Sequence, residues 1–173
     1  MVEHLDHLAR LGVAGIRVKR AEDFEGLAGL IMPGGESTCL QKLLEIFGLD
    51  TVIKREHERG LKIWGTCAGA ILLAREVVDE GPKLGLIDIR IARNAFGSQL
   101  DSFATHARVP QVAGDVELPL TFIRAPKILS VGQGVKILLK QNDYIAAAES
   151  DDVLVTVFHP ELTPCLAFHR YFA

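Results

Sequence analysis

Apolar residues along this chain form short continuous blocks that alternate with stripes at helical spacing. Four blocks rich in Val, Ile and Leu are typical of buried strands, and they lie at residues 13–18, 27–32, 61–64 and 153–158. Between the second and third blocks, apolar side chains recur every three or four residues from Leu40 to Phe47, and residues 52–59 continue in a helix-compatible pattern. Strands that alternate with helices predict an α/β fold, a three-layer sandwich around a mostly parallel, flavodoxin-like sheet.

The middle of the chain has a different pattern. From residue 86 to about residue 139, glycines and prolines recur between short β-rich pieces, which predicts a small antiparallel β insertion. Residues 144–149 and the block that follows return to the main sheet. A closing helix is expected to end near Phe172 and to start at Thr163 as N-cap, with Pro164 in its first position. Because the sequence contains no segment typical of a domain linker, residues 1–173 are predicted to form a single domain.

The start of the chain departs from the usual order of elements. A doubly wound domain generally opens with a strand, whereas Leu5, Leu8 and Leu11 already have helical spacing. We therefore expect the sheet to begin one strand late.

Composition and charge narrow the class of protein. The 173 residues, 49% of them hydrophobic and 24% charged, can build one globular core without a metal or a disulfide. The net charge of −3 argues against a nucleic acid or an anionic membrane as partner. No apolar run has the length of a membrane span, and the charged N-terminal residues do not resemble a signal peptide. Three widely spaced cysteines fit reduced thiols in the cytoplasm.

Cys67 lies in the sequence WGTCAGAILLA, between a predicted strand and an apolar helix. A thiol at a helix N-terminus is favoured as thiolate by free backbone N–H groups and by the helix dipole. A sharp strand-to-helix turn also needs small neighbours, and G-T-C-A-G matches the G-x-S-x-G nucleophile elbow with Cys in place of Ser. The alternative interpretation is a small buried cysteine that packs a helix against the sheet.

A nucleophilic thiol requires a base, and six histidines are available. His159 follows an apolar strand that Pro160 ends, so it emerges at a carboxyl end, where parallel α/β sheets build their sites. Glu161 is close enough to hydrogen-bond the imidazole and fix its tautomer. The alternative is an ordinary surface turn. His4 and His7 are expected on a solvated face of the first helix.

The sequence MPGGES at residues 32–37 can supply donors for an oxyanion. It ends the second predicted strand with two glycines and enters a helix through Glu36 and Ser37. Gly34 and Gly35 can present backbone N–H groups to a carbonyl without a Cβ in the way. A Pro-Gly-Gly turn is also common as a plain loop, and that alternative stays open for the motif taken alone.

Together, the motifs PGGES, GTCAGAILLA and FHPEL resemble the class I, triad-type glutamine amidotransferases. The finer resemblance is to the glutaminase subunits of pyridoxal 5′-phosphate (vitamin B6) synthase, and it is carried by GGEST, by RNAFGSQLDSF at residues 93–103 and by FIRAP at residues 122–126. The resemblance covers the chain from about residue 3. It implies an amidotransferase fold and a glutaminase that needs no metal or organic cofactor.

The resemblance also assigns residues by motif. It implies Cys67 as nucleophile, His159 as general base and Glu161 as the residue that orients it. The glutamine-binding residues that it implies are Gly35, Glu36, Ser37, Arg93, Ile123 and Arg124. The oxyanion hole would consist of backbone N–H groups from Ala68 and from the turn at Gly34 and Gly35. Arg93 or Arg124 can pair with the α-carboxylate of L-glutamine.

By resemblance, the partner is a (β/α)8-barrel synthase subunit that consumes the ammonia, in an assembly of twelve copies of each subunit. The chain departs from the family at its start, because members begin with a strand and a Leu-Gln-Gly turn ahead of the helix that matches EHLDHLARLG. That first strand is missing here. Three other functions stay open: a glutaminase for another synthase, an inactive subunit that only binds the synthase, and a peptidase-like protein.

Overall fold

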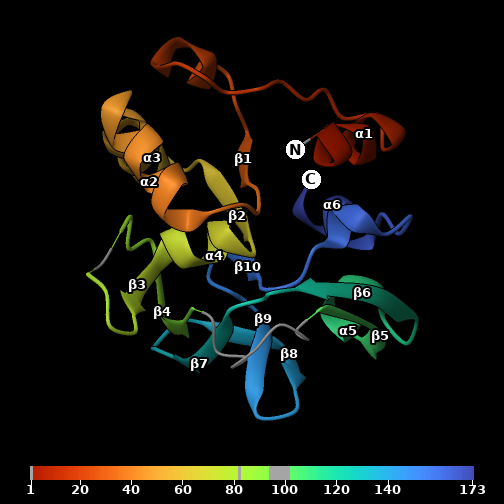
Figure 1. The fold of residues 1–173 in the computed structure, drawn as a ribbon. Helices are drawn as coiled ribbons and strands as arrows, with labels where there is room; N and C mark the ends of the chain where they lie inside the picture. The colour runs from red at the N-terminus through yellow and green to blue at the C-terminus, as the bar shows by residue number, and fades with distance from the viewer. Residues whose placement is uncertain (1, 82, 94–101) are drawn as a thin grey trace.

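The structure of the chain is a computed structural model that describes residues 2–81, 83–93 and 102–173. Within these ranges, eight strands form one curled sheet (Figure 1). In spatial order they are β1 (Gly29–Met32), β2 (Lys62–Thr66), β10 (Val153–Thr156), β9 (Tyr144–Glu149), β7 (Lys127–Val131), β4 (Ile87–Ala92) and β3 (Ala74–Val77), with β8 (Lys136–Gln141) paired to β9. A separate antiparallel pair consists of β5 (Ser102–Arg108) and β6 (Glu117–Ile123). The α/β class and the small antiparallel sheet are thereby confirmed.

The central sheet is mixed rather than mostly parallel. β1, β2 and β10 pair in parallel, as do β3 and β4. β9 pairs antiparallel with β10, β7 and β8, and β7 pairs antiparallel with β4. Parallel neighbours need a long crossover, such as the one through α2 (Ser37–Ile46) and α3 (Leu49–Glu58) between β1 and β2. Later in the chain, short turns join β8 to β9 and β9 to β10, so these consecutive strands form antiparallel hairpins in the main sheet.

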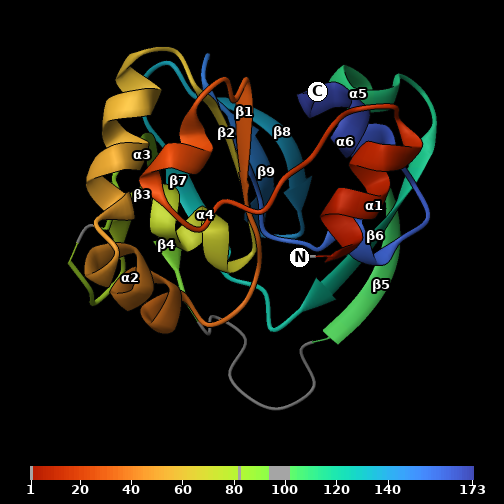
Figure 2. The same cartoon turned by 90° about the horizontal axis from the view of Figure 1, so that it is seen from above.

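Helices cover both faces of the sheet and complete three layers (Figure 2). α2 and α3 lie on one side, while α1 (Val2–Arg10), α6 (Ala167–Phe172) and the β5–β6 pair lie on the other. The short elements are α4 (Ala68–Leu73), α5 (Pro110–Ala113), and the 3₁₀ turns η1 (Ala21–Phe24) and η2 (Pro160–Leu162). In the described ranges, no helix is long and apolar enough to cross a membrane.

Two predicted elements differ from the structure. Residues 13–18 form an extended, largely exposed segment rather than a strand, because no strand of the described ranges pairs with them. The closing helix starts at Ala167 and not at Thr163. Thr163 instead stabilises the turn before it: its hydroxyl donates to the carbonyl of Pro160 at 3.1 Å and accepts the N–H of Cys165 at 3.3 Å.

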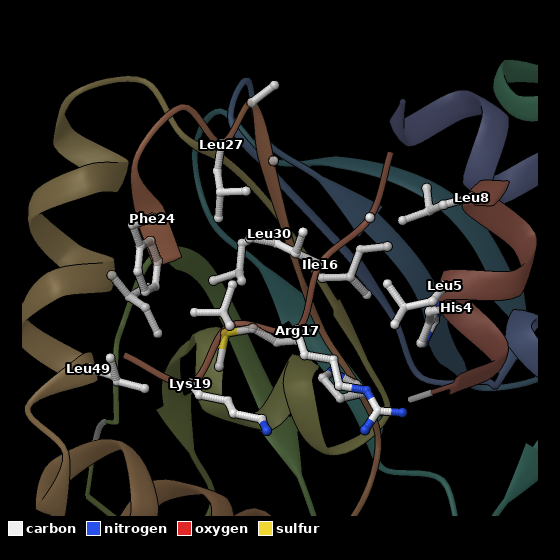
Figure 3. A pocket seen from close by; sticks show the side chains of 18 of the residues that line it. His4, Leu5, Leu8, Ile16, Arg17, Lys19, Phe24, Leu27, Leu30 and Leu49 are labelled. Carbon is white, nitrogen blue, oxygen red and sulfur yellow. The ribbon is translucent and has the colours of Figure 1, made fainter. Parts of the chain in front are cut away.

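A large apolar pocket lies between β1 and the extended segment at residues 13–18 (Figure 3). Its volume is about 1260 Å³, and its lining includes Leu5 and Leu8 of α1, Ile16 and Leu30. Among the described strands β1 pairs only with β2, so its other edge faces this pocket. The pocket therefore lies along the unpaired edge of β1 in the described part of the chain.

Three buried histidines join α1 and α6 to the sheet, which corrects the prediction that His4 and His7 are solvated. Both are 4% exposed, and His169 is fully buried. Nδ1 of His4 lies 2.8 Å from Nε2 of His169, and Nε2 of His7 lies 2.8 Å from the carbonyl oxygen of Thr163. The ring of Trp64 packs edge-on against His4 and His169. Because the imidazoles find partners inside, the polar side of α1 can face the core.

The buried histidines predict that the fold loses stability in mild acid. Burial lowers the pKa of His4 to about 4 and that of His169 to about 3, although the Glu161 carboxylate acts in the opposite direction. In the unfolded chain both groups titrate near pH 6.5. Between about pH 6.5 and pH 4 the unfolded chain therefore binds more protons than the folded one, so stability decreases as the pH falls through this window.

This expectation is tested by thermal unfolding between pH 7 and pH 4.5. The unfolding temperature should fall less steeply for His169→Gln, which cannot be protonated at this position, than for the native chain. His106→Gln removes an exposed histidine and serves as the matched control, with the native slope. Equal slopes in all three proteins would show that buried histidine protonation does not limit stability in acid.

Candidate active site

Cys67 occupies the turn between β2 and α4, as the sequence predicted. Its backbone has φ 49° and ψ −105°, a conformation that non-glycine residues rarely adopt. The N–H of Cys67 donates to the carbonyl of Thr156 in β10 at 2.8 Å, which ties the turn to the neighbouring strand. The thiol thus lies beside the first turn of α4, above the carboxyl ends of two parallel strands.

Two glycines allow α4 to approach the sheet. A Cβ on Gly69 would overlap the carbonyl oxygen of Met32 in β1, and a Cβ on Gly65 would come within 2.6 Å of the carbonyl carbon of Gly69. Real Cβ atoms do not approach so closely, so neither position can take a larger residue without displacing the backbone. The small residues of the G-T-C-A-G pattern therefore serve the packing that the elbow requires.

His159 and Glu161 lie beside the thiol, just beyond the end of β10. Nδ1 of His159 is 2.7 Å from Oε1 of Glu161, and the imidazole lies close enough to Cys67 for the thiol to affect its pKa. The backbone N–H of His159 donates to the carbonyl of Thr121 in β6 at 2.8 Å, so the small sheet also holds this residue. The structure thus brings together the three side chains that the sequence singled out.

The charges on His159 and Glu161 stabilise each other. Burial lowers the pKa of His159, but the neighbouring Cys67 and the hydrogen bond to Glu161 outweigh burial and raise this pKa to about 9. Burial raises the pKa of the Glu161 carboxyl, but the hydrogen bond from His159 and the nearby His4 outweigh burial, so the net shift is downward. At neutral pH the imidazole is therefore protonated next to an ionised carboxylate.

Gly34 places the predicted oxyanion turn directly against these side chains. A Cβ at Gly34 would lie 2.6 Å from Cε1 of His159 and 3.4 Å from Cβ of Cys67. Ala68, the other predicted donor, follows Cys67 at the start of α4 and is 1% exposed. The backbone at both positions borders the thiol, and the role of their N–H groups stays a prediction.

Two of the predicted glutamine-binding residues form an ion pair. Nη2 of Arg93 lies 3.1 Å from Oε1 of Glu36, and Nη1 of Arg93 donates to Oε1 of Glu80 at 2.6 Å. Glu36 is the N-cap of α2, where its carboxylate accepts two backbone N–H groups at 2.7 Å and 3.0 Å. These bonds, with a smaller effect of Arg93, lower the pKa of Glu36. Glu80, which the sequence reading did not single out, thereby belongs to the same ionic cluster.

The other predicted glutamine-binding residues lie on adjoining segments. Gly35 is between Gly34 and the N-cap, and Ser37 begins α2 with a hydroxyl that is buried and has no hydrogen-bond partner in the described part of the chain. Ile123 ends β6, and Arg124 follows with φ 43° and an exposed side chain. Most of the RNAFGSQLDSF motif, residues 94–101, lies outside the described residues.

His4 is a neighbour of the site that the sequence reading missed. Its Nε2 lies 3.6 Å from Oε2 of Glu161. A signal was present, since positions 4, 7, 8 and 11 form one stripe at helical spacing and a stripe that contains two leucines is a candidate for the buried face. Among the described residues, no group of three or more His, Cys, Asp or Glu side chains is arranged to hold a metal ion.

A thiol, an imidazole and a carboxylate at the carboxyl ends of parallel strands, on an α/β fold, define a class of proteins equipped for acyl transfer through cysteine. Comparison of sequences supplies the family within that class. The chain belongs to the SNO glutamine amidotransferase family, whose sequence pattern matches residues 1–173.

Individual relatives agree with this assignment. The pyridoxal 5′-phosphate synthase subunit PdxT of Syntrophus aciditrophicus is 63% identical over 170 residues, which cover 98% of this chain and 75% of that protein. The subunit of the same name from Clostridium beijerinckii is 49% identical over 173 residues, with 99% and 90% covered. A crystal structure of a glutamine amidotransferase superimposes with a TM-score of 0.91 at 41% identity, covering 99% of this chain and 90% of that one.

The contact of Gly34 with His159 predicts the effect of a single methyl group. In Gly34→Ala the new Cβ must displace the imidazole, and a misplacement of about 1 Å is expected to reduce the rate of glutamine hydrolysis about 100-fold. The matched control is Gly81→Ala, whose Cβ would meet nothing within 4 Å. Glutamate release by both variants at equal thermal stability checks the prediction, and native activity in Gly34→Ala would contradict it.

Proposed function

We propose that this chain is the glutaminase subunit of a pyridoxal 5′-phosphate synthase. The observation that carries the proposal is the convergence of Cys67, His159 and Glu161 in a chain that is 63% identical to a protein of that name. On this proposal, residues 1–173 form a single amidotransferase domain that hydrolyses L-glutamine to glutamate and ammonia in the cytoplasm. The ammonia passes to a (β/α)8-barrel synthase subunit.

The first half of the proposed reaction forms a thioester. The thiolate of Cys67 attacks the side-chain carboxamide carbon of glutamine, and the carbonyl oxygen becomes an oxyanion. Backbone N–H groups of Ala68 and of the turn at Gly34 and Gly35 stabilise that oxyanion. His159, protonated at neutral pH, donates its proton to the departing nitrogen. The C–N bond breaks, ammonia leaves, and a γ-glutamyl thioester remains on Cys67.

The second half of the reaction hydrolyses the thioester. His159, now neutral, takes a proton from water, and the resulting hydroxide attacks the thioester carbon. The C–S bond breaks, glutamate leaves, and Cys67 is again a thiolate beside a protonated imidazole. Glu161 keeps one edge of the imidazole occupied throughout, so that the other edge faces the thiol and the substrate.

The ion pairs of Arg93 and the exposure of Arg124 indicate different roles for the two predicted arginines in glutamine binding. Arg93 already bonds two carboxylates, those of Glu36 and Glu80, so we assign it the role of holding Glu36 in place. Arg124 is exposed, and we assign it the α-carboxylate of glutamine. Gly35, Ser37 and Ile123 complete the proposed pocket.

The test of the proposed function is glutamate release from L-glutamine, with and without the barrel synthase subunit. Cys67→Ala is the control. We expect activity that rises when the synthase subunit is added and that disappears in Cys67→Ala, because the thiolate of Cys67 makes the first attack on glutamine in the proposed reaction. Size-exclusion chromatography of the mixture tests the expected assembly of twelve copies of each subunit. A folded chain that binds the synthase subunit without releasing glutamate would instead be a binding subunit only.

The raised pKa of His159 predicts an alkaline limit to activity. A pKa of about 9 keeps the imidazole protonated up to that pH, and above it the proton for departing ammonia is lost. Removing the carboxylate in Glu161→Gln lowers this pKa, so the falling limb of kcat/KM should move to lower pH. Profiles between pH 6 and pH 10 check this, with exposed Glu58→Gln as the control. An identical limb in Glu161→Gln would refute the assigned role of the carboxylate.

A further inference from the structure

Beyond the three side chains at the thiol, a line of buried histidines continues from Glu161 into the protein. Glu161 uses Oε1 to accept the N–H of His159 at 2.7 Å, which leaves Oε2 facing Nε2 of His4 at 3.6 Å. On the far side of the His4 ring, Nδ1 lies 2.8 Å from Nε2 of His169. Glu161, His4 and His169 are each less than a tenth exposed. The line connects η2 to α1 and then to α6.

We propose that His4 is a positioning residue for glutamine hydrolysis: it holds the Glu161 carboxylate ionised and aligned with His159. The proposal rests on the function proposed above. In the described part of the chain, neither Nε2 of His4 nor Oε2 of Glu161 has a hydrogen-bond partner. A buried polar atom without a partner carries a free-energy cost, and each of these two atoms can relieve the other. Hydrogen bonds at catalytic sites are commonly long without substrate and shorten when it binds.

The hydrogen-bond pattern has one consistent direction. Burial keeps His4 and His169 neutral at physiological pH, with pKa values of about 4 and about 3, so each ring carries a single N–H. If Nε2 of His4 donates to Glu161, Nδ1 of His4 must accept, and Nε2 of His169 must donate to it. The remaining atom, Nδ1 of His169, is then a lone pair without a partner among the described residues. His169 therefore sets the tautomer that His4 needs.

The other titratable groups around His4 fit this arrangement. His7 lies on the same helix and His159 follows β10, and both disfavour a positive charge on His4. The Glu161 carboxylate is the negatively charged group acting on the His4 ring, and the rim of Trp64 covers another edge. In the proposed arrangement Glu161 accepts from an imidazolium at one oxygen, and the N–H of a neutral imidazole lies 3.6 Å from the other. Without His4, Oε2 is buried and unpaired, so the carboxyl gains a proton more easily and is free to turn away from His159.

The first measurement is the rate of Cys67 alkylation by iodoacetamide between pH 5 and pH 9.5. The background carries Cys39→Ser and Cys165→Ser, which leaves one thiol. In His4→Leu we expect the pH midpoint of alkylation to rise by about one unit, which makes alkylation about tenfold slower below the midpoint and unchanged well above it. His4→Gln, whose amide can replace the Nε2–H donor, should keep most of the native profile. With glutamine, kcat should fall most at low pH while KM stays constant.

Several outcomes would overturn the proposal. A native midpoint in folded His4→Leu would make His4 a packing residue, as would equal losses in the Leu and Gln variants at every pH. If His4→Leu does not fold, His169→Phe gives the same test, because it removes the donor that sets the His4 tautomer. A rise in the alkylation midpoint of His169→Phe supports the proposal, and an unchanged midpoint refutes it. Alkylation needs no turnover, so a native chain with a normal alkylation profile but no glutamate release would refute the proposed function alone.

Discussion

The site depends on a backbone conformation that cysteine does not adopt readily. At φ 49° the turn at Cys67 carries a strain of roughly 1–3 kcal/mol, and it persists only because its surroundings hold it. β2 ends in this turn, and β2 is paired in parallel on both sides, with β1 and with β10. The carbonyl of Thr156 in β10 accepts the N–H of Cys67, and Gly69 lets α4 pack directly against Met32 of β1. These two contacts fix the direction in which the chain leaves the turn. Everything else at the site is arranged around a thiol that this turn fixes.

The parts of the site that sequence could predict are those that are local in the chain. The G-T-C-A-G pattern encodes a tight turn because the bulk of its neighbours is limited, and His159 and Glu161 are two positions apart, so their contact follows from a single turn. Strands and helices with strong periodicity were predicted for the same reason. Contacts between distant segments carried no such signal. Arg93 bonding Glu80, and His4 facing Glu161, depend on how β4 and α1 pack, and periodicity in one element cannot report that.

The segment at residues 13–18 shows that a sequence typical of a strand forms one only where a neighbouring strand can pair with it. Its apolar, β-branched residues favour extended backbone, and the structure is extended there, but a strand also needs a neighbour to pair with. The apolar pocket separates this segment from β1 and leaves an open strand edge in the described chain. Ile16 is 57% exposed as a result, and Phe47, which lines the same pocket, is 64% exposed.

The packing of α1 and α6 connects the thiol site to the two ends of the chain. α1 supplies His4 and α6 supplies His169, and the imidazoles of both helices pack against the ring of Trp64 in β2. Glu161 lies where this cluster meets the thiol site, so its carboxylate responds to both. Protonation of His4 and His169 in acid would place like charges side by side on α1 and α6, and these charges would repel each other. It would also place positive charge beside Glu161, in competition with His159. Stability and the geometry around the thiol therefore rely on one set of neutral, buried histidines, and a change that loosens the terminal helices also frees the carboxylate that contacts His159.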